Sequence, residues 1–301
     1  MQVYSSFGTR YLCALFGKTR QAYYDQIKAS GNDQGLTESL VLRLVGEIRV
    51  DLPRCGTPKL HFMLQQRFVE HGIKMGRDAL NSLLGEHGML IRYRRRKPYT
   101  TDSNHAYKKY PNLIRDMALT APGQLWVSDI TYLRISSGFG YLSIITDAYS
   151  HKIVGYRLHP TLHSQGAIDA LLMAAKDVQR KGSLIHHSDR GTQYCCTAYV
   201  TMIEHLGVQL SMTEKGDPYE NAIAERVNGI LKHELGLNES FSTFEQATAA
   251  VDSAIRRYNS LRPHDSCDRL TPLIAHEQTG ILKKHWKPKV YKQQAATAQS
   301  T

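Results

Sequence analysis

Three acidic residues occupy positions where a carboxylate needs an explanation. Asp129 lies within the apolar, β-branched stretch 124–135, although Asp is depleted in strands and a lone buried carboxylate is costly. Asp189 ends the stretch 183–189, at a switch from apolar strand to polar loop where ligands often bind. Glu225 lies in a helical stretch. Each also has an ordinary interpretation: an edge aspartate facing water, a turn or helix cap, and a charge on a solvated helix face.

The spacing of these residues predicts metal-dependent phosphoryl transfer. Between Asp129 and Asp189 lie 59 residues, and 35 lie between Asp189 and Glu225. A central strand, the end of its neighbour and a helix packed across both can bring the three carboxylates together. Unit charges about 4 Å apart repel by about 4 kcal/mol at an effective dielectric of about 20, so such carboxylates converge only around a cation. Oxygen ligands favour Mg²⁺ or Mn²⁺, and two such ions can activate an attacking oxygen and stabilise a leaving one.

The surrounding sequence predicts a mixed sheet that positions these residues. Three stretches rich in β-branched and aromatic residues are joined by short connections, which favours antiparallel pairing. They span 124–135, 140–150 and 152–159. A helix, a short strand, a helix, a strand and a long helix are expected at 164–182, 183–189, near 197–206, 207–212 and about 218–235. This order predicts an α/β fold with a mixed five-stranded sheet and flanking helices. One more helix is expected over 243–261.

The first 91 residues show helical patterns only. Two short helices are expected within 7–30, with Thr19 as the cap of the second. Three more are expected within 37–91, and Pro58 opens the second of them. Apolar residues repeat at helical spacing at Leu40, Leu44 and Ile48, and again at Ala79, Leu80, Leu83 and Leu84. Short helices, Gly turns and a basic surface favour a helix-turn-helix DNA-binding region, with an ordinary helical bundle as the alternative.

The positive charge is concentrated at the same end of the chain. Of the net charge of +11, the first 115 residues carry +10, from 19 Lys and Arg against 9 Asp and Glu. Such a pole favours a polyanionic partner, with nucleic acid as the leading candidate and a merely soluble surface as the alternative. Residues 92–119 are expected to form a basic linker in which Arg94, Arg95 and Arg96 lie along phosphates.

The composition excludes several classes of protein. With 42% apolar and 22% charged residues among 301, the chain is not wholly disordered or fibrous. It has no apolar run of about 18–20 residues, so an integral membrane protein is excluded, and its N-terminus lacks the pattern of a signal peptide. Five cysteines without a C-x-x-C pair indicate neither a disulfide framework nor a zinc finger. A cytoplasmic protein is expected.

Several motifs carry a resemblance to a known superfamily. WVSDITY, HSDRGTQY and SMTEKGDPYENAIAERVNGILKHE resemble the catalytic core of DDE transposases and retroviral-type integrases. More closely, the chain is similar to OrfB-type transposases of bacterial insertion sequences with two overlapping reading frames. LFGKTRQAYYDQ, RCGTPKLHFML and YNSLRPHDSCDRLTP match the N-terminal start, helix-turn-helix block and C-terminal signature of that group. The resemblance therefore covers nearly the whole chain.

The resemblance implies a ribonuclease H-like fold for the mixed sheet. It implies that Asp129, Asp189 and Glu225 are catalytic and hold two Mg²⁺ ions, for which Mn²⁺ can substitute. The expected organisation is a helical DNA-binding region, a basic linker, the catalytic core, a C-terminal helical extension and a flexible tail. These parts span 1–91, 92–119, 120–236, 237–285 and 286–301.

Other residues around the triad are expected to contact DNA or support the carboxylates. Lys232 lies seven residues after Glu225 on nearly the same helix face, where the family carries a Lys or Arg that contacts the element's end; a plain surface lysine is the alternative. Further phosphate contacts are expected at Arg190, Lys215 and Asn221. We interpret His187 as a neighbour of the carboxylates or a DNA contact. Glu220 stands where the family usually has Asp and is interpreted as a cap of the helix start, and Asp147 as a structural turn residue.

These features together predict a DNA transposase that binds insertion-sequence ends and catalyses metal-dependent 3′-end cleavage and strand transfer. The expected partners are double-stranded DNA, as element ends and target, further copies of the chain as a dimer or higher, and the product of the upstream frame, with no membrane. The protein is expected at the bacterial nucleoid. The alternatives are a non-catalytic DNA-binding protein, a ribonuclease H-like nuclease that cuts without joining, and a helical transcription regulator, which leaves 124–236 unexplained.

Overall fold

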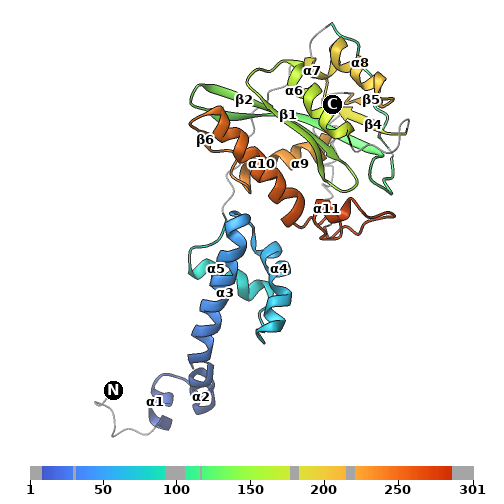
Figure 1. The fold of residues 1–301 in the computed structure, drawn as a ribbon. Coiled ribbons are helices and arrows are strands. Elements are labelled where there is room, and N and C mark those ends of the chain that lie inside the picture. Colours follow the sequence, from blue (N-terminus) through green and yellow to red (C-terminus); the bar gives the residue numbers. More distant parts are fainter. Residues whose placement is uncertain are drawn as a thin grey trace, which may run out of the picture. The chain divides into compact units, whose positions relative to one another are not determined.

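The chain folds into two compact units, residues 1–92 and residues 93–301. The computed structural model describes residues 9–29, 32–91, 106–115, 117–176, 183–214 and 221–286. In Figure 1 the helices of the first unit run from blue to cyan, and the second unit runs from green to red.

In the described part of the N-terminal unit, all of the secondary structure is helical. Its helices are α1 (Thr9–Leu15), α2 (Arg20–Ala29), α3 (Asn32–Asp51), α4 (Thr57–Glu70) and α5 (Arg77–Glu86). Thr19 caps α2 as expected, because its Oγ1 accepts a hydrogen bond from the Ala22 N–H at 3.1 Å. Helix α3 begins five residues earlier than the start expected at Thr37. The single Gly35 inside its first turns is tolerated, at a cost of about 1 kcal/mol relative to Ala.

Helices α3, α4 and α5 bury apolar side chains against one another. The buried residues of this region are Val41, Leu44, Val45, Leu52, Cys55, Leu60, Leu64, Phe68, Leu80, Leu83 and Leu84. Pro58 stands in the first turn of α4, as its missing N–H predicts. Ala79 was expected on the buried face of α5 but is exposed, because the buried stripe is already formed by the three leucines of that helix. Residues 71–76 form a short connection between α4 and α5.

A mixed sheet forms the centre of the C-terminal unit. Its strands are β1 (Leu125–Ile135), β2 (Gly138–Asp147), β3 (Ile153–His159), β4 (Ile185–Ser188), β5 (Gln209–Met212) and β6 (Ser240–Phe241). The five longer strands follow the order β3-β2-β1-β4-β5, with antiparallel pairing of β1 with β2 and β2 with β3, and parallel pairing elsewhere. The two-residue β6 adds a sixth strand beside the end of β1. It was not expected, because two residues are too short to show strand alternation.

Helices cover both faces of this sheet (Figure 1). The helices are α6 (Ser164–Ala175), α7 (Thr192–Cys195), α8 (Thr197–His205), α9 (Ala222–His233), α10 (Phe244–Leu261) and α11 (Pro272–Ala275). Successive strand residues point to opposite faces. Trp126 therefore packs with α6, α7 and α8 on one face, while Val127 packs with Ala224 of α9 on the other. Gly155 of β3 lets α6 approach closely, since a Cβ there would collide with the Ala170 carbonyl.

Part of the segment expected as a linker lies against the sheet. The Leu113 N–H donates to Ser211 Oγ at 2.9 Å, and the Met212 N–H donates to the Pro111 carbonyl at 3.3 Å. Ile114, Met117 and Leu119 pack on the apolar residues of the α9 face. Residues 106–115 and 117–119 thus extend the C-terminal unit, whereas 92–105 and 116 lie outside the described residues. No helix among the described residues is long and apolar enough to span a membrane.

Candidate active site

Two of the three candidate carboxylates sit side by side on neighbouring strands. Asp129 is the fifth residue of β1, and Asp189 follows the last residue of β4. In the parallel register, Val127 pairs with His187, so the next level of the sheet brings Asp129 and Asp189 together. Asp129 points toward the face covered by α9, because Val127 does so and side chains alternate. The sequence separation of 59 residues is closed by one strand pairing.

The surroundings of Asp129 make its charge costly. Burial, followed by the negative charge of Asp189, raises the pKa of Asp129 from 3.8 to about 7. Hydrogen bonds from the Ile130 N–H and from Asn228 lower the pKa, and the charge of Glu225 raises it. The charges of Asp189 and Glu225 thus both disfavour ionisation of the partly buried Asp129. Such an arrangement favours either a bound proton or a bound cation.

Asn228 is the direct contact between α9 and the candidate site. Its Nδ2 donates to Asp129 Oδ2 at 2.7 Å, while Asp129 Oδ1 accepts from the Ile130 N–H at 2.9 Å. Asn228 was not singled out in the sequence. The signal was present, because three residues turn a helix by about 300° and place Asn228 on the face of Glu225. Only the docking of α9 on β1 identifies which of the neighbouring side chains reaches Asp129.

Glu225 and Lys232 flank Asn228 along the same face of α9. Glu225 is exposed in the first turn, and Lys232 is half-buried in the last turn. Burial lowers the pKa of Lys232, the nearby Asp129 raises it, and Arg134 of β1 lowers it. The lysine therefore lies within electrostatic reach of both Asp129 and Arg134. One face of α9 thus carries a carboxylate (Glu225), an amide (Asn228) and a cation (Lys232) beside β1.

The loop after β4 orients Asp189. Asp189 Oδ1 accepts a hydrogen bond from the Gly191 N–H at 2.9 Å, and a Cβ at position 191 would lie 3.0 Å from that oxygen. A side chain at 191 would therefore press on the carboxylate. Arg190 is partly exposed beside it, which is compatible with the expected phosphate contact.

Asn221, an expected phosphate contact, and His187, an expected neighbour of the carboxylates or DNA contact, are both buried. Asn221 donates through Nδ2 to the Ser128 carbonyl at 2.9 Å and is 7% exposed, so it ties the start of α9 to β1 and does not face DNA. His187 is fully buried, with its Nδ1 2.9 Å from Ser211 Oγ, so it is not a DNA contact; its place two residues before Asp189 is compatible with the other expectation, a neighbour of the carboxylates. Asn221 instead serves a backbone carbonyl of the central strand β1, and the His187 ring contacts the Ser211 hydroxyl of the neighbouring strand β5. The other expected residues, Lys215, Glu220, Arg94, Arg95 and Arg96, lie outside the described residues.

A buried polar cluster lies behind Asp129 on the other face of β1. Ser128 Oγ is 2.6 Å from His186 Nε2, and the Tyr199 hydroxyl is 3.0 Å from the same nitrogen. Burial lowers the pKa of His186 to about 3, so this imidazole is neutral at physiological pH. His186 is therefore a packed histidine. The cluster couples β1 to β4 and α8 immediately before the two aspartates.

The donor set at this site has the chemistry of a Mg²⁺ or Mn²⁺ site. Its candidate ligands are carboxylate oxygens, which hard divalent cations prefer. In the part of the chain that the structure describes, no three His, Cys, Asp or Glu side chains lie together so that they could hold a metal ion. The Asn228 amide instead donates to Asp129 Oδ2. The raised pKa of Asp129 marks the same place as one where a positive charge would be favourable.

Two protein-family models match the C-terminal unit, and both carry the same description. Residues 120–218 match a family model described as the integrase core domain, and residues 206–272 match a second model with that description. The first contains Asp129 and Asp189, and the second contains Glu225 and reaches into the C-terminal extension.

Individual relatives extend the similarity to the N-terminal unit. A 31 kDa protein of insertion element IS600 from Shigella sonnei is 34% identical over 269 residues, which cover 89% of this chain and 98% of the relative. The transposase InsF of insertion sequence IS3A from Escherichia coli K12 is 32% identical over 221 residues, covering 73% and 75%. Among solved structures, the integrase catalytic core domain of HTLV-2 in complex with magnesium matches with a TM-score of 0.42 and 18% identity, covering 52% of this chain and 97% of that one.

Proposed function

The chain belongs to the DDE transposases and integrases, among the transposases of bacterial insertion sequences, and we propose that Asp129, Asp189 and Glu225 are its catalytic, metal-binding carboxylates. The chain thus acts in DNA transposition and integration, and its family performs polynucleotidyl transfer. The observation that carries the residue assignment is the raised pKa of Asp129, because it arises from burial and from the charges of Asp189 and Glu225. A divalent cation would offset the charges of Asp189 and Glu225 that disfavour ionisation of Asp129.

The proposed reaction consists of two in-line displacements at phosphorus. First, a water oxygen bonds to phosphorus at the element's end and the bond to the 3′ oxygen breaks, which leaves a 3′ hydroxyl and a 5′ phosphate. That 3′ hydroxyl then bonds to a phosphorus of the target, and a target 3′ oxygen leaves with a proton. Two Mg²⁺ ions, or Mn²⁺ in their place, would activate the attacking oxygen and stabilise the leaving one.

The protein's own residues hold and orient the reacting groups. The Gly191 N–H and the Ile130 N–H each hold one oxygen of an aspartate, which limits carboxylate rotation. Asn228 donates to the remaining oxygen of Asp129 and keeps α9 against β1. Glu225 completes the carboxylate set from α9. Lys232 places a cation beside the carboxylates for a phosphate of the element's end.

The N-terminal unit is proposed to bind the element's end through α4 and α5. A short connection joins these two helices, as in helix-turn-helix modules. The basic residues Arg94, Arg95, Arg96 and Lys215 remain proposed phosphate contacts. Pairing two element ends implies at least two copies of the chain, and the upstream-frame product is a further proposed partner. The reaction is assigned to the cytoplasm, at the nucleoid.

A cleavage and joining assay tests the catalytic assignment. The substrate is labelled duplex that carries the terminal sequence of the element, with Mg²⁺ or Mn²⁺. We expect cleaved and joined products from the wild type, and none from Asp129→Asn, Asp189→Asn or Glu225→Gln, although these variants still bind the duplex. Glu204→Gln is the matched control, because Glu204 is an exposed carboxylate on α8.

Other outcomes of this assay would contradict parts of the proposal. Cutting without joining would favour a nuclease, provided that addition of the upstream-frame product does not restore joining. A triad variant that cleaves normally would remove that residue from the catalytic set. Binding without any reaction, even with the upstream-frame product, would identify a DNA-binding protein that has lost catalysis.

A further inference from the structure

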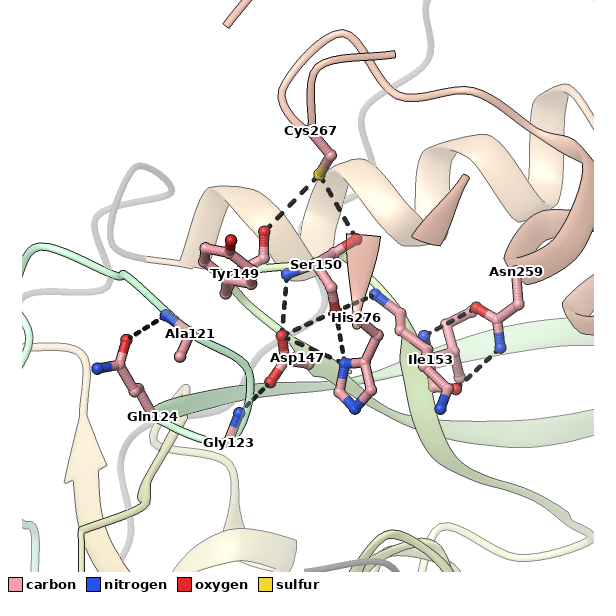
Figure 2. A network of polar contacts seen from close by, with 11 residues as sticks. Ala121, Gly123, Gln124, Asp147, Tyr149, Ser150, Ile153, Asn259, Cys267 and His276 are labelled. Carbon is pink, nitrogen blue, oxygen red and sulfur yellow. Dashed lines mark hydrogen bonds and ion pairs between the residues drawn. The ribbon is translucent and has the colours of Figure 1, made fainter. Parts of the chain in front are cut away.

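The C-terminal extension is fastened to the end of β2 by a buried polar network. Asp147 accepts hydrogen bonds from the Gly123 N–H at 2.8 Å, from the Ser150 N–H at 2.9 Å and from the Ser150 hydroxyl at 2.8 Å. Ser150 Oγ lies 2.9 Å from Nδ1 of His276, which follows α11. Figure 2 shows His276 reaching this network together with Cys267, whose thiol lies 3.5 Å from the Ser150 carbonyl. Asp147 therefore has the structural turn role expected for it.

A second attachment joins α10 to β3. Asn259 accepts from the Ile153 N–H and donates to the Ile153 carbonyl, each at 3.0 Å, as a neighbouring strand would (Figure 2). The chain between Asn259 and His276 is thus held to the sheet at both ends. Strand β2 pairs with β1 along its whole length, so this segment shares a rigid frame with Asp129.

Arg262 lies between these two attachments in the sequence and forms an ion pair with the residue at the end of α9. Its Nε donates to Glu234 Oε2 at 2.8 Å and its Nη2 to Glu234 Oε1 at 2.9 Å, a bidentate pair. Its Nη1 donates to the Pro263 carbonyl at 3.3 Å. The arginine is 2% exposed, and Glu234 is the C-cap of α9. The sheet, the C-terminal segment and the last turn of α9 therefore form a closed chain of contacts.

The Arg262–Glu234 ion pair is on the opposite side of α9 from the candidate site. Glu234 lies nine positions after Glu225, which corresponds to about 13 Å along a helix and about 180° around it. Asn228 and Asn221 hold the near face to β1, and Arg262 holds the far face. Glu225 itself is exposed, so packing around its side chain does not position it. Its position is set by the helix that carries it.

We propose that Arg262 is a positioning residue for the transposition reaction: by binding Glu234 it sets the rotation of α9 about its axis, and so directs Glu225 and Asn228 toward Asp129. This rests on the proposed function. A helix has a radius of about 5–6 Å with its side chains, so a rotation of about 20° displaces Glu225 by about 2 Å. A misplacement of about 1 Å already costs about 100-fold in rate. A buried ion pair is replaceable by apolar residues for stability alone, which leaves orientation as its specific contribution.

The test separates orientation from folding with two variants. The double variant Arg262→Met/Glu234→Met removes both charges of the buried pair, and the second partner of Glu234, Arg226 at 3.4 Å, is exposed to solvent. Arg262→Lys keeps the charge but loses the planar fork. Leu171→Ala, in the core on the α6 face, is the control for a general loss of stability. For each we would measure thermal unfolding, binding of the element-end duplex, and the single-turnover joining rate as a function of Mg²⁺ concentration.

We expect both Arg262 variants to fold and bind DNA, with a joining rate about 10- to 100-fold lower or a correspondingly higher Mg²⁺ requirement. Leu171→Ala should unfold at lower temperature yet join at the wild-type rate and Mg²⁺ dependence below that temperature. The proposal is overturned if the Arg262 variants fold and join as the wild type does, or if neither folds, because the pair is then a folding element. Failure of the proposed function is distinct, since the wild type itself would then yield no triad-dependent products.

Discussion

Replacing Asp129 by asparagine should stabilise the metal-free protein at pH 8 while abolishing cleavage and joining. The pKa of Asp129 is raised from 3.8 to about 7, chiefly by burial and by the charge of Asp189. The folded state therefore binds a proton more tightly than the unfolded chain does. Stability of the wild type is consequently lost as the pH rises from about 4 to about 7, and it stays lost above that range.

The size of this effect follows from the same values. Each pKa unit corresponds to about 1.4 kcal/mol, so a rise of about three units is worth at most about 4 kcal/mol above pH 7. The carboxyl is partly exposed, and an asparagine can accept only one of the two hydrogen bonds from Ile130 and Asn228. We therefore expect a net gain of about 2 kcal/mol at pH 8, which corresponds to about 4–8 °C in melting temperature for a domain of this size.

The assay is thermal unfolding at pH 4.5 and pH 8, in chelator and in Mg²⁺. The gain from Asp129→Asn should be small at pH 4.5, and Mg²⁺ should raise the melting temperature of the wild type more than that of the variant. Asp147→Asn is the control, because its carboxylate accepts three hydrogen bonds and its replacement should cost about 1–3 kcal/mol at both pH values. An equal gain at both pH values, or none at pH 8, would refute the reasoning.

Three further substitutions test the site and its frame. Asn228→Ala removes a hydrogen bond that lowers the pKa of Asp129, so the acidic limb of the joining rate should move to higher pH in a profile recorded from pH 5 to 9; an unchanged limb would exclude this coupling. Lys232→Ala should weaken binding of the element end and reduce its log–log salt slope by about 1, and Lys232→Arg should restore both, as titration by fluorescence anisotropy would check. Gly155→Ala should destabilise the C-terminal unit by about 3–5 kcal/mol, because its Cβ would collide with the Ala170 carbonyl; a melt like that of the wild type would mean that α6 can move away.

The antiparallel pairing of the first three strands was predictable because it depends on local patterns. Alternation and short connections predicted β1, β2 and β3 as antiparallel neighbours, and the structure confirms this pairing. An acidic residue within β1 and another at the end of β4 were conspicuous against apolar neighbours. Helix α9 was expected from about 218, whereas its described residues begin at Ala222.

The roles of individual polar residues were less predictable, because they depend on which partner lies across a contact. Asn221 and His187 are residue types that often contact ligands. The structure buries Asn221 against β1 and His187 against β5. Asn228 was overlooked because an asparagine on a helix carries no charge to mark it. It reaches Asp129 only because α9 crosses β1 at one position.

The sequence by itself determined the longer helices and strands, the residues available for chemistry and the concentration of positive charge in the first 115 residues. These follow from periodicity and residue type, which act over a few neighbours along the chain. Only the tertiary structure decided that Asp129 is partly buried beside Asp189 with a pKa of about 7, and that Arg262 binds Glu234 on the side of α9 opposite Glu225. Burial, repulsion and ion pairing depend on distances in space, and here the paired groups are 28 to 60 positions apart in the chain.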